Sequence, residues 1–122
     1  LHAVAVAATD LYTSNGYLFV QGGRIRPWKR SRWRIENTRL TTDHLMASSA
    51  IPIFFPSVQI GGRHFGDGCI RNTSPLSPAI NLGAERVIAI GVQGPAAIEP
   101  PRRRLPPPTI AQIAGVLLDA VM

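Results

Sequence analysis

The chain has 122 residues, of which 45% are hydrophobic and 16% charged, so its composition excludes a disordered chain and a fibrous repeat. Its net charge is +6, and twelve of the thirteen basic residues are Arg, which suits phosphate or carboxylate partners. The single cysteine, Cys69, excludes an internal disulfide framework and a multi-cysteine zinc site. No spanning apolar run or secretory signal is visible, so we expect a cytoplasmic protein that at most attaches peripherally to a membrane. The start at Leu1 and an apolar pattern that still runs at Met122 suggest a piece of a longer protein.

The first third of the chain predicts a hairpin. Residues 3–8 form a short apolar run typical of a buried strand, and Asn15-Gly16 favours a tight turn before a return strand over residues 17–20. Thr41 or Thr42 is a good N-cap with Asp43 in the first turn, which predicts a helix over residues 43–50.

A second hairpin and a helix–strand unit are expected next. Gly61-Gly62 separates strands over residues 57–60 and 63–65, and the second strand leads directly to Asp67. Ser77 and Gly83 bound a helix over residues 78–82, and the β-branched run at 86–92 is typical of a strand covered on both faces. A helix followed by a buried strand indicates a parallel sheet.

The C-terminal part divides into two segments. Six prolines and three consecutive arginines in residues 93–108 predict an extended surface linker. Thr109 caps a helix that continues to residue 122, whose apolar side chains fall on one face, so we expect this helix to dock on an apolar surface.

A basic segment lies between the two hairpins, with six Lys and Arg in residues 24–34, whereas residues 41–92 carry three acidic and three basic side chains. Two tryptophans interleave with these bases, a pattern that fits lipid headgroups, stacked nucleobases, or a solvated loop whose tryptophans anchor in the core. No nucleic-acid-binding framework accompanies the segment, so we expect no nucleic acid partner. An anionic membrane surface is the candidate partner, and its candidate contacts are Arg24, Arg26, Trp28, Lys29, Arg30, Arg32, Trp33 and Arg34.

Asp67 is the first candidate for chemistry, because a carboxylate between two glycines can point from a tight turn into a cleft. On local sequence alone, a solvent-exposed turn aspartate is the alternative. Cys69 could pair with His64 as a nucleophile and base, or form a His-x-x-Asp-x-Cys metal site, but a lone cysteine after a strand is more often a small buried apolar residue. His2 and His44 are expected at the edge of the core. None of the serines lies in a Gly-x-Ser-x-Gly elbow.

Two stretches of residues 43–92 carry a resemblance to a known family. One reads Ala-Ser-Ser-Ala-Ile-Pro-Ile-Phe-Phe-Pro, and the other runs from Gly-Asp-Gly-Cys through Pro-Leu-Ser-Pro-Ala to Leu-Gly-Ala. Together they resemble the patatin-like phospholipases, and residues 7–11 and 109–122 also look like segments of bacterial members. Cys69 departs from the family's usual Gly or Ala after Asp-Gly, a change that a small thiol should tolerate.

The resemblance implies a serine lipid acyl hydrolase with a serine–aspartate dyad, in which Asp67 matches the aspartate of the motif at Asp67, Gly68 and Cys69. The family's nucleophile and glycine-rich oxyanion loop precede the region corresponding to Leu1. We therefore expect residues 1–92 to be the C-terminal part of a three-layer α/β/α catalytic domain with a mostly parallel sheet, its N-terminal half absent, followed by a linker at 93–108 and a truncated helix at 109–122.

The function expected on this basis is hydrolysis of acyl esters of lipids, with Asp67 as general base for a serine outside this chain and with no metal or other cofactor. The missing half of the same domain would then be a partner. Two alternatives remain: an inactive remnant of the fold that binds membranes through its arginines, and a basic nucleic-acid-binding domain.

Overall fold

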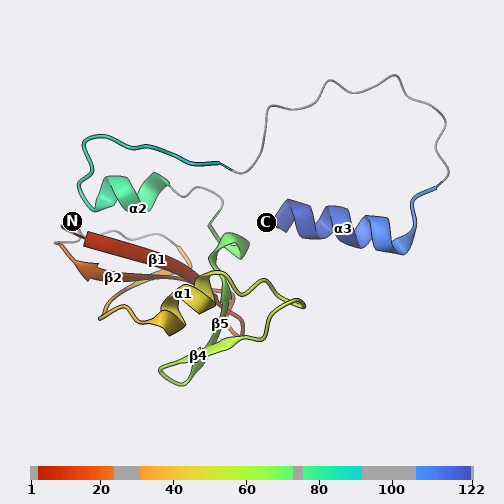
Figure 1. Cartoon of the computed structure of the whole chain (residues 1–122), viewed down its shortest axis with the longest axis horizontal. Coiled ribbons are helices and arrows are strands. Elements are labelled where there is room, and N and C mark those ends of the chain that lie inside the picture. The colour runs from red at the N-terminus through yellow and green to blue at the C-terminus, as the bar shows by residue number, and fades with distance from the viewer. Residues whose placement is uncertain (1–2, 24–30, 73–75, 92–106, 122) are drawn as a thin grey trace. The chain divides into compact units, whose positions relative to one another are not determined.

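The computed structural model describes residues 3–23, 31–72, 76–91 and 107–121. These residues form two units, Leu1–Val87 and Ile88–Met122. The first contains a sheet with two helices, and the second contains one helix (Figure 1).

The sheet of the first unit has five strands in the order β3-β2-β1-β5-β4. The strands are β1 (Ala3–Asp10), β2 (Gly16–Gly22), β3 (Trp33–Asn37), β4 (Val58–Ile60) and β5 (Arg63–Asp67). The central strand β1 is antiparallel to β2 from Ala3 to Thr9 but meets β5 only through its last three residues, Ala8 to Asp10. The strand leading to Asp67 is therefore attached at one end of β1.

Both predicted hairpins are present. The first turn differs from the expected tight turn at Asn15-Gly16. The residue with a positive φ is Ser14, at 57°, and Asn15-Gly16 does not form a two-residue turn. Gly16 instead begins β2, where its missing side chain makes room for the Trp33 ring: a Cβ on Gly16 would lie 2.8 Å from that ring. In the second hairpin, Gly61 and Gly62 both have positive φ, as the tight turn between β4 and β5 requires.

The expectation of a mostly parallel sheet is wrong for the described residues, because three of the four neighbouring strand pairs are antiparallel and β2–β3 alone is parallel. Short connections explain this result, since strands joined by loops such as 11–15 and 61–62 can pair only in the antiparallel sense. The strand β3 was not predicted. It is only five residues long, it begins inside the basic segment, and only Trp33 and Ile35 of its side chains are half-buried.

The buried strand predicted at 86–92 is also wrong over residues 86–91; Val92 lies outside the described residues. Ile88 and Ile90 are 92% and 94% exposed. A β-branched run forms a strand only where a neighbour completes its backbone hydrogen bonds, and within the described part of the chain no strand pairs with it.

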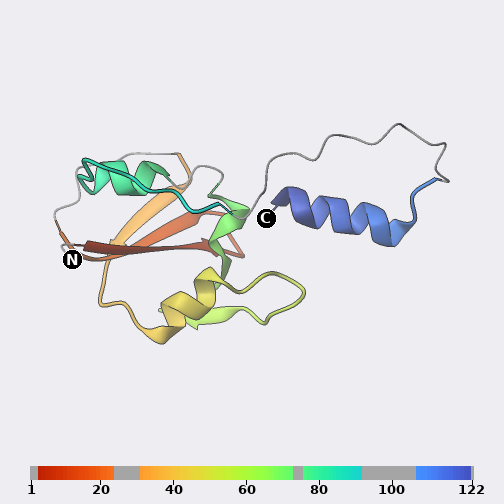
Figure 2. The same cartoon turned by 45° about the horizontal axis from the view of Figure 1, so that its top comes forward.

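Two helices lie on opposite faces of the sheet, giving a helix–sheet–helix arrangement (Figure 2). The helix α1 (Thr42–Ser48) covers the face that carries Ala8, while α2 (Leu76–Asn81) lies near Ala3 and Ala5, whose side chains point to the other face. Both helices were predicted, with ends shifted by one or two residues, and Gly83 has the expected positive φ of 91°. The α/β class is thus confirmed.

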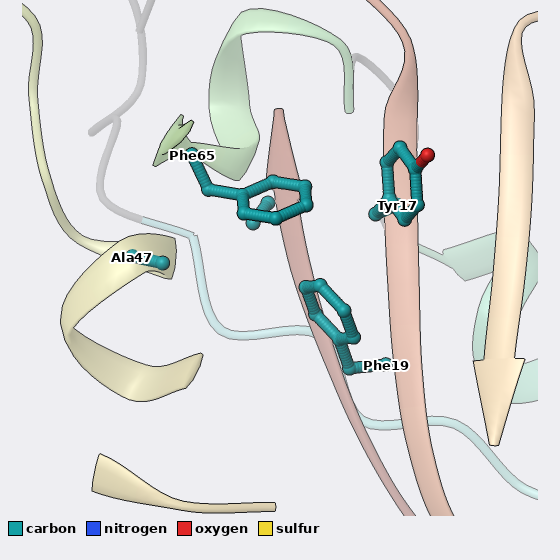
Figure 3. Close-up of a cluster of buried hydrophobic side chains, with 5 residues drawn as sticks. Tyr17, Phe19, Ala47 and Phe65 are labelled. Carbon is teal, nitrogen blue, oxygen red and sulfur yellow. The ribbon is translucent and has the colours of Figure 1, made fainter. Parts of the chain in front are cut away.

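The core under α1 is aromatic and compact. The rings of Tyr17, Phe19 and Phe65 pack against one another with centroids 5.0–5.9 Å apart, and Ala47 of α1 closes the cluster (Figure 3). His44 is buried beside Phe19, and its Nδ1 accepts a hydrogen bond from the Thr41 N–H at the start of α1. The prediction of a core-edge histidine at position 44 is confirmed, whereas His2 lies outside the described residues.

The second unit contains α3 (Ile110–Val121), which begins after Thr109 as predicted. The Thr109 hydroxyl accepts a hydrogen bond from the Gln112 N–H, and the Gln112 side chain accepts one from the Thr109 N–H. Ile110, Ile113 and Val116 are exposed. In the part of the chain that the structure describes, no helix is long and apolar enough to span a bilayer.

Candidate functional site

Asp67 is the last residue of β5 and is 8% exposed, so it is not a solvent-exposed turn residue. Its position follows from the predicted strand–turn–strand pattern, which ends the second strand at this carboxylate. Directly after it, the chain turns into a short 3-10 helix, η1 (Gly68–Ile70), for which Asp67 is the N-cap.

Three hydrogen bonds fix this residue. Its N–H donates to the Ala50 carbonyl (2.9 Å), its carbonyl accepts from the Thr9 hydroxyl (2.8 Å), and its Oδ1 accepts from the Cys69 N–H (2.8 Å). The second carboxylate oxygen, Oδ2, makes no hydrogen bond with the described residues. The carboxylate is thus oriented through one oxygen, while the other retains its capacity to accept a proton.

Gly68 lets the chain after Asp67 pass against β1. A Cβ at Gly68 would lie 2.5 Å from the Ala7 carbonyl oxygen, which is backbone and cannot move aside without shifting β1. The glycine after the aspartate is therefore required by close backbone packing, and its φ is not in the left-handed region.

The end of β1 supports the site through successive residues. Ala8 pairs with Asp67, Thr9 binds its carbonyl, and Asp10 binds Arg63 at the start of β5. The end of β1 is thus the support against which the candidate aspartate is held.

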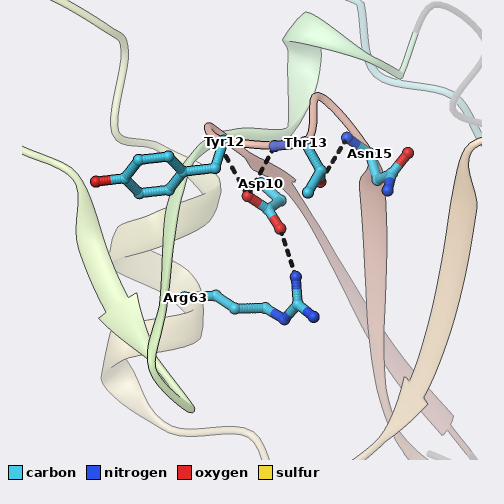
Figure 4. Close-up of polar contacts among 5 residues, drawn as sticks. All are labelled: Asp10, Tyr12, Thr13, Asn15 and Arg63. Atoms are coloured by element: carbon cyan, nitrogen blue, oxygen red, sulfur yellow. Dashed lines mark hydrogen bonds and ion pairs between the residues drawn. The ribbon is translucent and has the colours of Figure 1, made fainter.

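Asp10 is almost fully buried and accepts hydrogen bonds from the Tyr12 and Thr13 N–H groups and from Arg63 Nη1 at 2.9 Å (Figure 4). Burial alone would raise the pKa of Asp10, but these hydrogen bonds outweigh it and the pKa lies below its usual value. Asp10 therefore closes the loop after β1 and ties it to β5, and it is a structural carboxylate.

Cys69 is exposed, so the expectation of a small buried apolar residue is wrong at this position. Cys69 lies in the 3-10 turn of η1, directly after Gly68. Partial desolvation of the thiol, followed by the negative charge of Asp67 and a hydrogen bond to it, raises the pKa of Cys69. A thiol with a raised pKa is a poor nucleophile at neutral pH.

His64 does not pair with Cys69. Its Nδ1 lies 3.1 Å from the Ser57 hydroxyl across the β4–β5 hairpin, and its ring contacts Tyr12 edge to face. The described residues hold no group of three or more His, Cys, Asp or Glu side chains placed to bind a metal ion.

The basic segment is only partly described. Arg24, Arg26, Trp28, Lys29 and Arg30 lie outside the described residues. Arg32 and Arg34 are exposed, and the half-buried Trp33 ring packs over Gly16 in the neighbouring strand.

Thr9 and Ala50 are the residues of the site that the sequence did not single out. A hydrogen bond between residues 58 positions apart, such as the one from Thr9 to Asp67, has no signal in the local sequence. In retrospect, the buried polar side chain of Thr9 at the end of an apolar strand is the one usable hint.

The fold and this site define an α/β protein with a buried aspartate held at a strand end. A family model described as Patatin-like phospholipase matches residues 15–80, more than half of the chain. The chain belongs to the patatin-like phospholipase family. No curated protein matches it.

Proposed function

We propose that this chain supplies the general-base carboxylate, Asp67, of a serine lipid acyl hydrolase whose nucleophile lies outside these 122 residues. The family acts on lipid esters, which gives the substrate class. The observation that carries the proposal is the placement of Asp67: it is buried, its backbone is bonded to Thr9 and Ala50, and Oδ1 is oriented by Cys69.

The chemistry needs one group that first accepts and then returns a proton. In the proposed step, a serine oxygen attacks the ester carbon while its proton moves to Asp67; the carbon–oxygen bond to the leaving alcohol then breaks and that alcohol takes the proton. Water repeats the sequence to release the fatty acid. Because no histidine intervenes, the carboxylate has to be held rigidly, and its three hydrogen bonds support that requirement.

The test uses two proteins. The 122-residue chain alone should not hydrolyse a short-chain chromogenic ester, because it has neither nucleophile elbow nor oxyanion donors for the reaction. In a protein that joins this chain to the serine-bearing part, Asp67→Asn should lower kcat by about 10²–10⁴-fold. Turnover by the isolated chain that is lost in Asp67→Ala, or near-normal kcat in Asp67→Asn, would contradict the proposal.

We further propose that the basic segment binds the protein to anionic lipid surfaces, where its substrate lies. Each base near such a surface contributes about 1 kcal/mol, and the attraction falls with salt. Replacing Arg26, Lys29, Arg30 and Arg32 with Gln should weaken co-sedimentation with anionic vesicles at low salt and leave hydrolysis of a soluble ester unchanged. If the parent and the variant co-sediment with the vesicles equally, the basic segment only keeps the protein soluble.

A further inference from the structure

Asn72, two residues after the end of η1, carries a buried oxygen without a partner. Its Oδ1 is shielded from solvent, and among the described residues no N–H or O–H group donates to it. No other buried side-chain oxygen or nitrogen of the described residues is in this situation. Buried polar atoms are almost always hydrogen-bonded, because an unsatisfied one costs the free energy of its desolvation. The Asn72 amide therefore retains the capacity to accept a hydrogen bond.

Backbone hydrogen bonds fix Asn72 relative to the candidate base. The Gly68 carbonyl accepts both the Asn72 N–H, at 2.9 Å, and the Arg71 N–H, at 3.2 Å. Gly68 directly follows Asp67 and lies so close to the Ala7 carbonyl of β1 that a Cβ would not fit between them. Asn72 is therefore bonded to the residue next to the candidate base, in a closely packed part of the fold.

The same segment is tied to the loop that follows β1. Arg71 Nε donates to the Ser14 carbonyl at 2.6 Å. With this bond on one side and the Gly68 carbonyl on the other, the backbone at 71–72 cannot move toward a new partner without breaking a hydrogen bond. A donor for Asn72 Oδ1 therefore has to approach a backbone that is already in place.

The proposed reaction brings one candidate for that donor to this end of the sheet. Asp67 acts by direct contact with a serine, so the serine-bearing part of the domain has to pack where β5 ends and η1 begins. The ester group of a substrate offers only acceptor oxygens, and it cannot serve an amide oxygen that itself accepts. The serine-bearing part, with its own N–H and O–H groups, has the chemistry that Oδ1 requires.

We infer that Asn72 is a positioning residue, whose Oδ1 accepts a hydrogen bond from the serine-bearing part and so holds the serine within reach of Asp67. The inference rests on the proposed function for the existence of that part. It assigns to Asn72 a role that Asp67 does not share, because Asn72 fixes the distance over which the proton moves and takes no proton itself.

The first experiment uses the protein that joins this chain to the serine-bearing part, called the joined protein. Asn72→Leu removes the amide at similar volume, so kcat on a soluble ester should fall about tenfold while KM stays the same, since the lost bond is not to the substrate. Asn72→Asp keeps an acceptor oxygen in place and should retain most of kcat. Asn37→Leu, which replaces an exposed amide of β3, is the matched control and should behave like the parent.

Thermal unfolding provides a measurement that does not need catalysis. In the 122-residue chain alone, Asn72→Leu replaces an unsatisfied oxygen with an apolar group, so Tm should not fall. In the joined protein, the same substitution leaves the donor unpaired and should lower Tm by about 2–4 °C or more. If Asp67→Asn keeps its activity, the proposed function fails, whereas this difference between the two proteins would still assign the hydrogen bond to Asn72.

Parental kcat and parental Tm in the joined Asn72→Leu protein would overturn the inference. An equal fall of Tm in the isolated chain and in the joined protein would overturn it as well, because the donor would then be water or a group of this chain. Equal loss of kcat in Asn72→Asp and Asn72→Leu would show that the amide nitrogen, and not Oδ1, makes the contact, which also contradicts it.

Discussion

The hydroxyl of Thr9 donates a 2.8 Å hydrogen bond to the backbone carbonyl of Asp67, and both residues are buried. This bond ties the end of β1 to the end of β5 at the position of the candidate base. The bond involves the backbone of Asp67, so it fixes the position of this residue. Neither oxygen of the Asp67 carboxylate takes part in it.

Thr9→Val removes this bond while keeping the side-chain volume. The buried Asp67 carbonyl would lose its partner, so we expect the free energy of unfolding to fall by about 1–3 kcal/mol. Urea denaturation followed by circular dichroism measures the change. Thr9→Ser keeps the hydroxyl and should recover most of the loss; equal destabilisation by both variants would show that packing, and not the hydrogen bond, matters here.

Asp10→Asn tests the ion pair between the buried Asp10 carboxylate and the half-exposed Arg63 side chain. The pKa of Asp10 is lowered in the folded state, so its stabilising contribution is present above its unfolded value of about 3.8 and is lost as the pH falls through the lower folded pKa. At pH 7 the variant should be less stable by about 1–2 kcal/mol, and the difference should shrink below about pH 4. Glu36→Gln, an exposed carboxylate of β3, is the control; a difference independent of pH would contradict the assignment.

Gly68→Ala should disturb the site through the backbone. The new Cβ would meet the Ala7 carbonyl oxygen, so β1 and η1 have to move apart, and we expect a loss of about 1–3 kcal/mol in the free energy of unfolding. Gly91→Ala introduces the same methyl group into open space and should be nearly neutral. The measurement is thermal unfolding of both variants, and equal melting temperatures would contradict the close approach.

Cys69 reports the charge of Asp67 without any assay of activity. The nearby carboxylate is one cause of the raised pKa of the thiol, so Asp67→Asn should lower that pKa and increase the thiolate fraction at pH 8. Alkylation by iodoacetamide should then be faster, and the midpoint of its pH profile should shift downward. Asp43→Asn makes the same change in net charge and should leave the rate unaltered.

The elements of the fold that could be predicted are those that depend on a few adjacent residues of the sequence. The Gly61-Gly62 turn, the Thr41 cap and Gly83 each depend on a few adjacent residues, and the structure reproduces all three elements they indicated. The direction of strand pairing depends on partners far along the chain, so the parallel sheet and the strand at 86–91 were wrong. Asp67 was found from its flanking glycines and the family resemblance, while its supports Thr9 and Ala50 required the fold.

The restriction of β1–β5 pairing to three residues has a consequence for the order of folding. The β1–β2 hairpin joins neighbouring segments over seven pairs and has little loop entropy to overcome, whereas β5 must close a loop of more than fifty residues to reach Thr9. We expect the hairpin to form first and β5 to add late to the end of a strand already in place. Asp67 would then acquire its orientation in one of the last steps of folding, after the β1–β2 hairpin has formed and before the site is assembled.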